Sequence, residues 1–295
     1  MAIFVTGDTH GPDKLSLHSV DGFVNRLNMM SFPEQKEMTK DDFVVILGDF
    51  GGVWNYTGET KEEKHNLDWL ESRNFTTLFI PGNHENYDCL TGLSDKTLID
   101  SWMFKDLNQK VKKQILNGYP QKAWHGGVVR VIRPSVLMLE RGYVFEIDGC
   151  KCFAFGGARS HDISDGILKA EDFSNRRLLK KEIDRWNLED KDFRVNHISW
   201  WEQEMPEQME MERGLAMLED EKRKVDFIFT HDCPSYNKVA FLGAALGKPD
   251  ALTKYFDEIQ RTVQYKKWFF GHLHGNMVFP GNKEILLYEQ IIRIA

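Results

Sequence analysis

The amino-acid sequence predicts a layered α/β fold, in which buried strands alternate with amphipathic helices. Seven runs of strand length, rich in β-branched and aromatic residues, are almost continuously apolar, as is typical of strands covered on both faces. Helical patterns lie between several of these runs, which is the element order of layered α/β proteins. With 41% hydrophobic and 28% charged residues among 295, the composition suits a globular protein with a proper core.

The expected strands follow one another along almost the whole chain. In order they are residues 2–8 (AIFVTGD), 42–50 (DFVVILGDF), 76–84 (TTLFIPGNH), 128–139 (VVRVIRPSVLML), 151–158 (KCFAFGGA), 225–232 (VDFIFTHD) and 267–274 (KWFFGHLH). Two helices are expected from their periodicity, one over residues 62–73 and one over 250–263. The second places Leu252, Phe256 and Ile259 on one stripe, which predicts an amphipathic helix.

A strongly charged segment interrupts this pattern between residues 169 and 224. It holds 12 Lys/Arg and 15 Asp/Glu in 56 residues, so half of it is charged, which suits solvated helices laid over a core. No repeat, low-complexity tract or Gly/Ser linker divides the chain. We therefore expect a single domain, 1–295, with a charged helical insertion around residues 160–222 that forms a rim or lid.

One helix inside the charged segment is expected from a capping signal. Ser199 is followed three residues later by Glu202, which is the spacing of a capping box. This interpretation places Trp200 and Trp201 in a first helical turn. Packing of the two rings against the core is the preferred interpretation, and an aromatic shelf facing the substrate is the alternative.

Charge and the composition of the first residues argue against several classes of protein. The formal net charge is −7 and the sequence pI is about 5.8, which disfavours nucleic acid as a partner. A phosphorylated substrate remains compatible with this charge, because bound cations can dominate the field inside a site. The first residues lack a signal-peptide pattern, and no apolar run approaches the ~18 residues of a membrane helix. The four cysteines fit reduced thiols, so we expect a cytoplasmic protein.

Five of the expected strands end in side chains of the kinds that bind metal ions. Ligands in open α/β folds gather beyond the carboxyl ends of strands, so these side chains are expected to face one crevice. A glycine precedes a ligand residue at positions 7, 48, 82 and 271, where it allows a tight turn and close backbone approach. The side chains are Asp8, His10, Asp49, Asn83, His84, His231, His272 and His274.

His272 and His274 lie one residue apart directly after an aromatic run. If the backbone is extended there, side chains two positions apart point to the same side and converge. An isolated pair of this kind is more often two surface histidines in a turn. Here, however, five histidines lie at strand ends beside glycine or another ligand type, and their joint occurrence favours a metal site. The remaining five have no such context and are interpreted as ordinary residues: His18, His65, His125, His161 and His197.

The order of motifs GDxH, GD, GNHE, H and GHxH resembles that of the calcineurin-like metallophosphoesterase family, and the match spans Asp8 to His274. The resemblance implies a four-layer α/β/β/α sandwich of two mixed β-sheets flanked by helices, with the active site at the C-terminal ends of strands. It also implies two metal ions, one on Asp8, His10 and His274 and the other on Asn83, His231 and His272, with Asp49 bridging both. A metal-bridging hydroxide would attack phosphorus, and His84 would donate a proton to the leaving group.

The chemistry of these residue types agrees with that implication. Imidazole, carboxylate and amide oxygen suit manganese, iron, zinc or cobalt and do not choose among them. Two aspartates against two dications leave a local charge of roughly +2, which attracts a phosphate despite the acidic protein. The expected activity is therefore metal-dependent hydrolysis of a phosphomonoester or phosphodiester, in a phosphorylated small molecule or a phosphoprotein.

Two other functions remain open. GDTHG and GNHE resemble the serine/threonine phosphoprotein phosphatase branch, but Gly52 stands where that branch has the aspartate that orients the proton donor. Pro81 stands where it has an arginine, and Arg159 in the segment FGGARSHD is a candidate phosphate ligand instead. A non-catalytic scaffold is the second alternative. It is disfavoured because every expected ligand and His84 are present.

Overall fold

The computed structural model describes residues 1–11 and 22–295. His18 lies outside the described residues. The strands are β1 (Ile3–Thr6), β2 (Phe43–Ile46), β3 (Thr76–Phe79), β4 (Gln121–Trp124), β5 (Gly127–Arg133), β6 (Val136–Leu139), β7 (Tyr143–Ile147), β8 (Cys150–Phe155), β9 (Gly166–Leu168), β10 (Phe193–Val195), β11 (Phe227–Thr230), β12 (Lys267–Phe270), β13 (Met277–Val278), β14 (Glu284–Leu286) and β15 (Ile291–Arg293).

Helices of varied length connect these strands. The α-helices are α1 (Phe23–Arg26), α2 (Lys61–Glu71), α3 (Tyr87–Leu90), α4 (Gln109–Asn117), α5 (Arg176–Leu188), α6 (Gln208–Asp220), α7 (Ser235–Leu242) and α8 (Ala251–Thr262). Short 3₁₀ helices are η1 (Pro33–Glu37), η2 (Lys96–Asp100), η3 (Ala170–Asp172) and η4 (Glu202–Glu204). Among the described residues, every helix is too short or too polar to cross a lipid bilayer.

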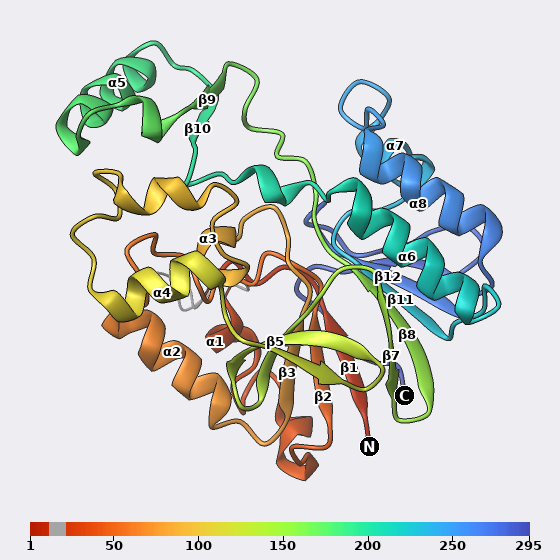
Figure 1. The fold of residues 1–295 in the computed structure, drawn as a ribbon. Coiled ribbons are helices and arrows are strands. Elements are labelled where there is room, and N and C mark those ends of the chain that lie inside the picture. Colours follow the sequence, from red (N-terminus) through yellow and green to blue (C-terminus); the bar gives the residue numbers. More distant parts are fainter. Residues whose placement is uncertain (12–21) are drawn as a thin grey trace.

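Two mixed sheets pack face to face between layers of helices (Figure 1). The seven-stranded sheet has the order β15-β1-β2-β3-β6-β5-β4, and its four middle strands β1, β2, β3 and β6 are parallel. The six-stranded sheet has the order β13-β14-β12-β11-β8-β7, and β14, β12, β11 and β8 are parallel. The predicted four-layer α/β/β/α sandwich is confirmed.

Three apolar layers hold the sandwich together. Alternate residues of a strand point to opposite faces, and β1 shows the result. Ile3 and Val5 lie between the two sheets, whereas Phe4 packs under the helices of the first sheet. On the outer face of the second sheet, α8 buries its predicted stripe of Leu252, Phe256 and Ile259 against Phe153 and Trp268 of β8 and β12.

All seven expected strand segments and both expected helices contain the predicted element. Residues 128–139 differ in one respect, because they form the antiparallel pair β5 and β6 instead of a single strand. Pro134 and Ser135 make the reversal, and proline with serine favours a turn. Because apolar residues lie on both sides of this short turn, the hydrophobic pattern does not reveal it.

The region expected as an insertion, around residues 160–222, contains α5, the parallel pair β9 and β10, and α6, and the first three project away from the sandwich in Figure 1. The capping box expected at Ser199 and Glu202 is wrong. Ser199 Oγ instead accepts the N–H of Val195 at 3.0 Å, and α6 begins at Gln208 behind its own capping box of Glu207 and Glu210. The spacing recurs by chance in so charged a segment, and a capping signal alone does not distinguish the two sites.

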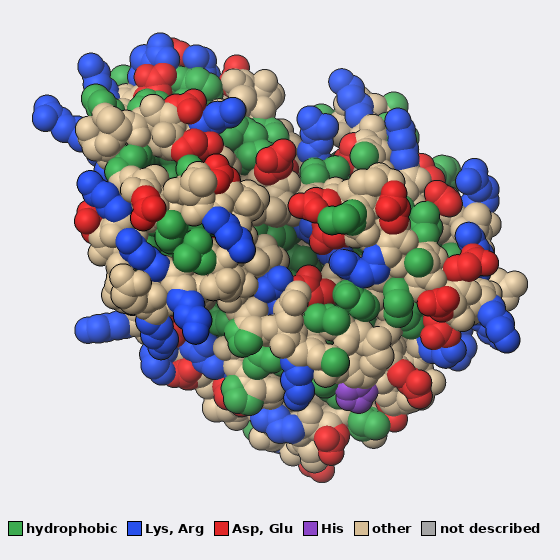
Figure 2. All heavy atoms as spheres, viewed as in Figure 1, with side chains coloured by type: hydrophobic (Ala, Val, Ile, Leu, Met, Phe, Trp, Pro, Cys, Tyr) green, Lys and Arg blue, Asp and Glu red, His purple; other side chains and the backbone are tan. Residues whose placement is uncertain are grey.

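Charges of both signs are interspersed over the face shown in Figure 2. Lys and Arg side chains alternate there with Asp and Glu, including on the projecting α5 region. No single-sign field dominates this face.

Candidate metal centre

The predicted site residues meet where the parallel strands of both sheets end. Loops after β1, β2 and β3 carry Asp8, His10, Asp49, Asn83 and His84, and loops after β11 and β12 carry His231, His272 and His274. Each sheet contributes part of the cluster. The carboxylates come from the seven-stranded sheet and three of the imidazoles from the six-stranded one.

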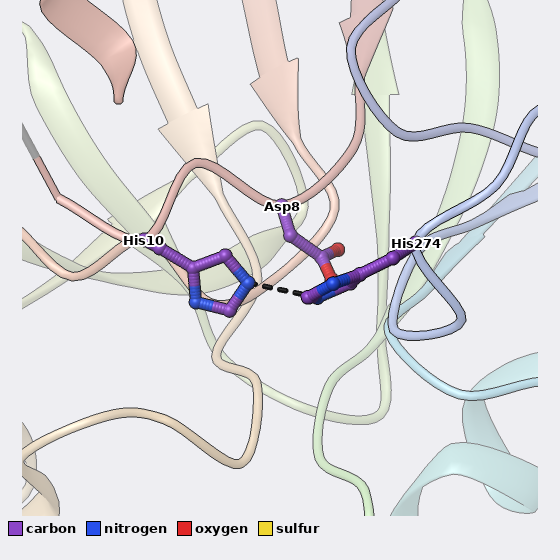
Figure 3. A group of neighbouring side chains, drawn as sticks. All are labelled: Asp8, His10 and His274. Atoms are coloured by element: carbon purple, nitrogen blue, oxygen red, sulfur yellow. Dashed lines mark hydrogen bonds and ion pairs between the residues drawn. The ribbon is translucent and has the colours of Figure 1, made fainter. Parts of the chain in front are cut away.

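Asp8, His10 and His274 form the first group of converging ligand atoms (Figure 3). His10 Nε2 lies 2.9 Å from His274 Nε2, and His274 Nε2 lies 3.3 Å from Asp8 Oδ2. These atoms lie within 4.8 Å of one another, close enough for a single ion to contact all three. Two imidazole nitrogens and a carboxylate oxygen in this arrangement suit a borderline divalent cation.

His231 is the centre of the second group. Its Nδ1 donates to the carbonyl oxygen of Leu47 at 2.7 Å, since a carbonyl can only accept. In the neutral form of the ring, which is the form that binds a metal, Nε2 has a lone pair, and that atom faces Asn83 Oδ1 at 3.1 Å and Asp49 Oδ1 at 3.4 Å. Lone pairs that face one another with no hydrogen between them suit a bound cation. The residues present thus fit a bound metal ion, with Leu47 fixing the ring as an outer partner.

His272 lies beside this second group. Its ring centroid is 5.0 Å from that of His231, and its backbone N–H donates to both carboxylate oxygens of Asp8 at 3.0 Å. Burial holds the pKa of His272 well below its ordinary value. A neutral imidazole is the form that binds a metal.

The predicted role of the glycines is confirmed at the closest contacts. A Cβ on Gly48 would overlap the His231 ring, and Gly48 also has a φ of +98°. A Cβ on Gly271 would overlap the Asp8 carboxylate. These glycines therefore leave the space that the ligand side chains of the opposite sheet occupy.

Four candidate ligands have left-handed backbone, with φ of 48° at His10, 44° at Asp49, 66° at His272 and 47° at His274. The extended backbone assumed for His272 and His274 is therefore wrong. Both rings still line one cavity, but tight turns direct them there and not the alternation of a strand. Such backbone is uncommon outside glycine and collects at functional sites.

Charge and burial oppose each other at Asp8. Burial alone would raise the pKa of this carboxyl, but the neighbouring His231, His274 and His10 and the N–H of His272 lower it below its ordinary value. The carboxylate is thus anionic at neutral pH, as a metal ligand must be.

A cavity of about 540 Å³ opens over the cluster and contains His84. The backbone N–H of His84 donates to Asp49 Oδ1 at 2.8 Å, which fixes the residue beside the candidate ligands. Burial lowers the pKa of His84, and the charge of Asp49 opposes this effect.

Arg159 lines the same cavity, and within the described part of the chain it makes no hydrogen bond or ion pair. Its predicted position at the site agrees with the structure, while its role stays a prediction.

The structure adds residues that the sequence did not single out. Lys248 and His161 line the same cavity, although the sequence pattern indicated an ordinary residue at His161 and nothing at Lys248. Asp162, held by an ion pair with Arg194, acts electrostatically on His84. The only sequence signal for Asp162 was its place three residues after Arg159.

Gly52 cannot be replaced by the aspartate of the phosphoprotein phosphatase branch. A Cβ there would overlap the Phe50 ring, which is fully buried. The structure therefore has no space for an orienting carboxylate at this position.

A larger cavity of about 630 Å³ lies between α6 and the β5–β6 pair, away from the cluster. Its arginines are already paired, Arg130 with Glu140 at 2.6 Å and Arg141 with Glu210 at 3.1 Å. Size alone does not identify a site, and this cavity holds no candidate metal ligand.

Comparison with known proteins gives the family. The sequence model of the calcineurin-like phosphoesterases matches residues 1–276, and no curated protein matches the chain. Among solved structures, a Staphylococcus aureus protein assigned as a 5'-nucleotidase is 13% identical, with a TM-score of 0.42. The match covers 99% of this chain and 50% of that one. The phosphopantetheinyl hydrolase of Mycobacterium tuberculosis is 14% identical, with coverage of 98% and 90% and a TM-score of 0.36.

These two structural likenesses are too remote to carry an argument about substrate, and the chain spans half the length of the first. The family match is of another kind, since it extends from the first strand to the residues just beyond His274. On that match, the chain belongs to the calcineurin-like phosphoesterase family.

Proposed function

We propose that the chain hydrolyses a phosphorylated small molecule, a phosphomonoester or a phosphodiester, with two divalent cations held where the two sheets meet. The observation that carries the proposal is the lone-pair geometry at His231, whose Nε2 faces the oxygens of Asn83 and Asp49 with no donor between them. Membership of the family supports the class of reaction.

The proposed ligand sets divide the cluster in two. Two divalent cations would neutralise phosphate charge and lower the pKa of a bound water towards about 7. Asp49 would contact both ions, because its two oxygens face His231 on one side and His10, at 3.9 Å, on the other. The remaining ligands are Asp8, His10 and His274 for one ion and Asn83, His231 and His272 for the other.

His84 acts as the proton donor in this proposal. The oxygen of water forms a bond to phosphorus while the bond between phosphorus and the leaving oxygen breaks. The leaving oxygen keeps the bonding electrons and takes a proton from His84, and the attacking water supplies the proton that restores the ring. One water is consumed for each ester bond.

Arg159 is proposed to bind a substrate oxygen. Its guanidinium has no partner within the described residues and lies in the same cavity as His84. A guanidinium can donate two parallel hydrogen bonds to a phosphate, which favours it over a solvated role at this place.

The test is metal removal followed by metal return. The chain is stripped of metal, and turnover of p-nitrophenyl phosphate and bis(p-nitrophenyl) phosphate is measured before and after adding manganese, iron, zinc or cobalt. We expect two bound ions per chain and turnover only after the metal is returned. If two ions bind and neither ester is hydrolysed, the scaffold hypothesis replaces this one. If no ion binds, the metal assignment itself is wrong.

A further inference from the structure

We propose that the substrate is a phosphodiester that spans two cavities meeting at His84, with a planar aromatic leaving group against Trp54 and an anionic second group near Arg159 and Lys248. The inference rests on the proposed function and gives its substrate class. It is carried by the shape of the site on both sides of His84.

Two cavities share His84 as a wall. The first, of about 540 Å³, contains the candidate ligands Asp49, Asn83, His272 and His274. The second, of about 500 Å³, contains His10 and Trp54. A phosphoryl group at the candidate ligands therefore has an open space on each side. A phosphodiester has an organic group on each side of phosphorus and fills both spaces, whereas a monoester leaves one of them empty.

Trp54 forms a fixed aromatic wall in the second cavity. Its backbone N–H donates to Glu63 Oε1 at 2.7 Å, and its backbone carbonyl oxygen accepts from Asn86 Nδ2 at 3.0 Å. Its ring packs at 75° against that of Trp201, with centroids 5.5 Å apart. Trp201 is fully buried, so Trp54 is held in place before any ligand binds. A half-buried ring fixed in this way suits stacking of a planar group, because little freedom is lost on binding.

The first cavity presents two cations to the second organic group of the substrate, the arm that is not the leaving group. Arg159 and Lys248 both line it, and neither has an ion pair or hydrogen bond within the described ranges 1–11 and 22–295. Lys238 in the same wall differs, because its ammonium is paired with Asp232 at 2.5 Å. Unpaired cations facing a cavity favour an anion there, which points to a negatively charged group on the second arm.

The experiment uses three p-nitrophenyl phosphodiesters that share one leaving group and differ only in the second group, which is methyl, carboxymethyl or choline. All are assayed with the metal-loaded full chain beside p-nitrophenyl phosphate. We expect higher kcat/KM for the diesters than for the monoester, and the lowest KM for the carboxymethyl ester.

Two substitutions separate the two arms. Trp54→Leu is expected to raise KM for all three diesters roughly tenfold with little change in kcat, and Trp54→Phe to retain most of the affinity. Lys248→Glu is expected to raise KM for the carboxymethyl ester alone and to make the choline ester the better substrate. Trp186→Leu is the matched control, because Trp186 is also a half-buried indole with an edge contact, to Phe193, but on α5.

Three results would overturn the inference: a monoester preferred over every diester, unchanged KM in Trp54→Leu, or unchanged ester preference in Lys248→Glu. Failure of the proposed function is distinguished by a binding measurement. Carboxymethyl phenyl phosphate, a slowly reacting diester, is titrated calorimetrically into metal-loaded wild type and Trp54→Leu. Tenfold weaker binding to the variant without any turnover would retain the substrate geometry and refute the hydrolase.

Discussion

Two buried polar clusters in this molecule look alike in composition and differ in how their atoms are matched. At the candidate metal centre, His231 Nε2 faces two oxygen acceptors. In α3, Asp88 Oδ2 accepts from His197 Nδ1 at 2.8 Å and from Trp201 Nε1 at 2.9 Å. No donor lies between the facing lone pairs of the first cluster, which is donor-poor and suits a cation, whereas Asp88 Oδ2 in the second cluster is matched by two donors. The matching of donors and acceptors, and not the presence of histidine, distinguishes a binding site from a structural contact.

The largest effect is expected in the donor-poor cluster, from a substitution of the carboxylate that both proposed ions share. Asp49→Asn should reduce turnover below detection and lower bound metal, because Asp49 is proposed to contact both ions. The loss should exceed the roughly 10–100-fold typical of removing an outer partner of a metal ligand. In metal-free protein the free energy of unfolding should not fall, since Asp49 and Asp8 repel each other without a cation.

Asp41→Asn is the matched control for Asp49→Asn. Asp41 is exposed just before β2, and Asp49 follows the same strand at its other end. Metal content by elemental analysis and turnover of both aryl esters are the measurements. Turnover like that of the wild type in Asp49→Asn would refute the bridging assignment.

The next effect separates His84 from the metal ligands around it. His84→Asn should retain bound metal while turnover falls roughly 10²–10⁴-fold, which is the usual contribution of a general acid. The fall should be steepest for esters with poor leaving groups, since those depend most on protonation. Loss of metal in this variant would instead make His84 a ligand.

Sequence reasoning placed the donor-poor cluster because strand ends and their glycines are local signals. Asp8, Asn83 and His274 follow buried strands directly, so the topology of an α/β fold brings them together. The second cavity could not be predicted in the same way. Trp54 is positioned by Glu63, Asn86 and Trp201, contacts that only the folded chain makes.

The buried contact of His197 with Asp88 could not be predicted from the sequence either. The sequence indicated an ordinary residue, and the structure agrees that it lies outside the metal centre, but it is buried and bonded to Asp88. Nothing in the sequence joins positions 88 and 197. Pairing of buried polar groups across long separations depends on tertiary packing, which hydrophobic periodicity does not encode.

The smallest expected effect tests the matched cluster through pH. Burial alone would lower the pKa of His197, but the hydrogen bond and charge of Asp88 raise it above the ordinary value. A raised pKa in the folded state means that the interaction stabilises the protein below about pH 6.5 and is lost as pH rises through the folded pKa. His197→Asn should therefore cost roughly 1–3 kcal/mol in acid and less in alkali.

Denaturant unfolding of wild type and His197→Asn measures this difference at about pH 5 and about pH 9, which lie on either side of the ordinary histidine pKa. Asparagine keeps the left-handed backbone of residue 197, which has a φ of 61°. His65→Asn on the exposed face of α2 is the control. A difference that grows with pH would reverse the assigned sign, and loss of metal would show that the two clusters are coupled.

The left-handed turns at the centre also bear on how such a site can change in evolution. Of the eleven described non-glycine residues with positive φ, nine are aspartate, asparagine or histidine. These are the residue types that tolerate this backbone best, and all three can also ligate metals. Exchange among them at His10, Asp49, His272 or His274 would leave the turns intact while altering the hardness of the donor set. Preference could thus drift from zinc-like towards magnesium-like ions by single substitutions, on an unchanged scaffold.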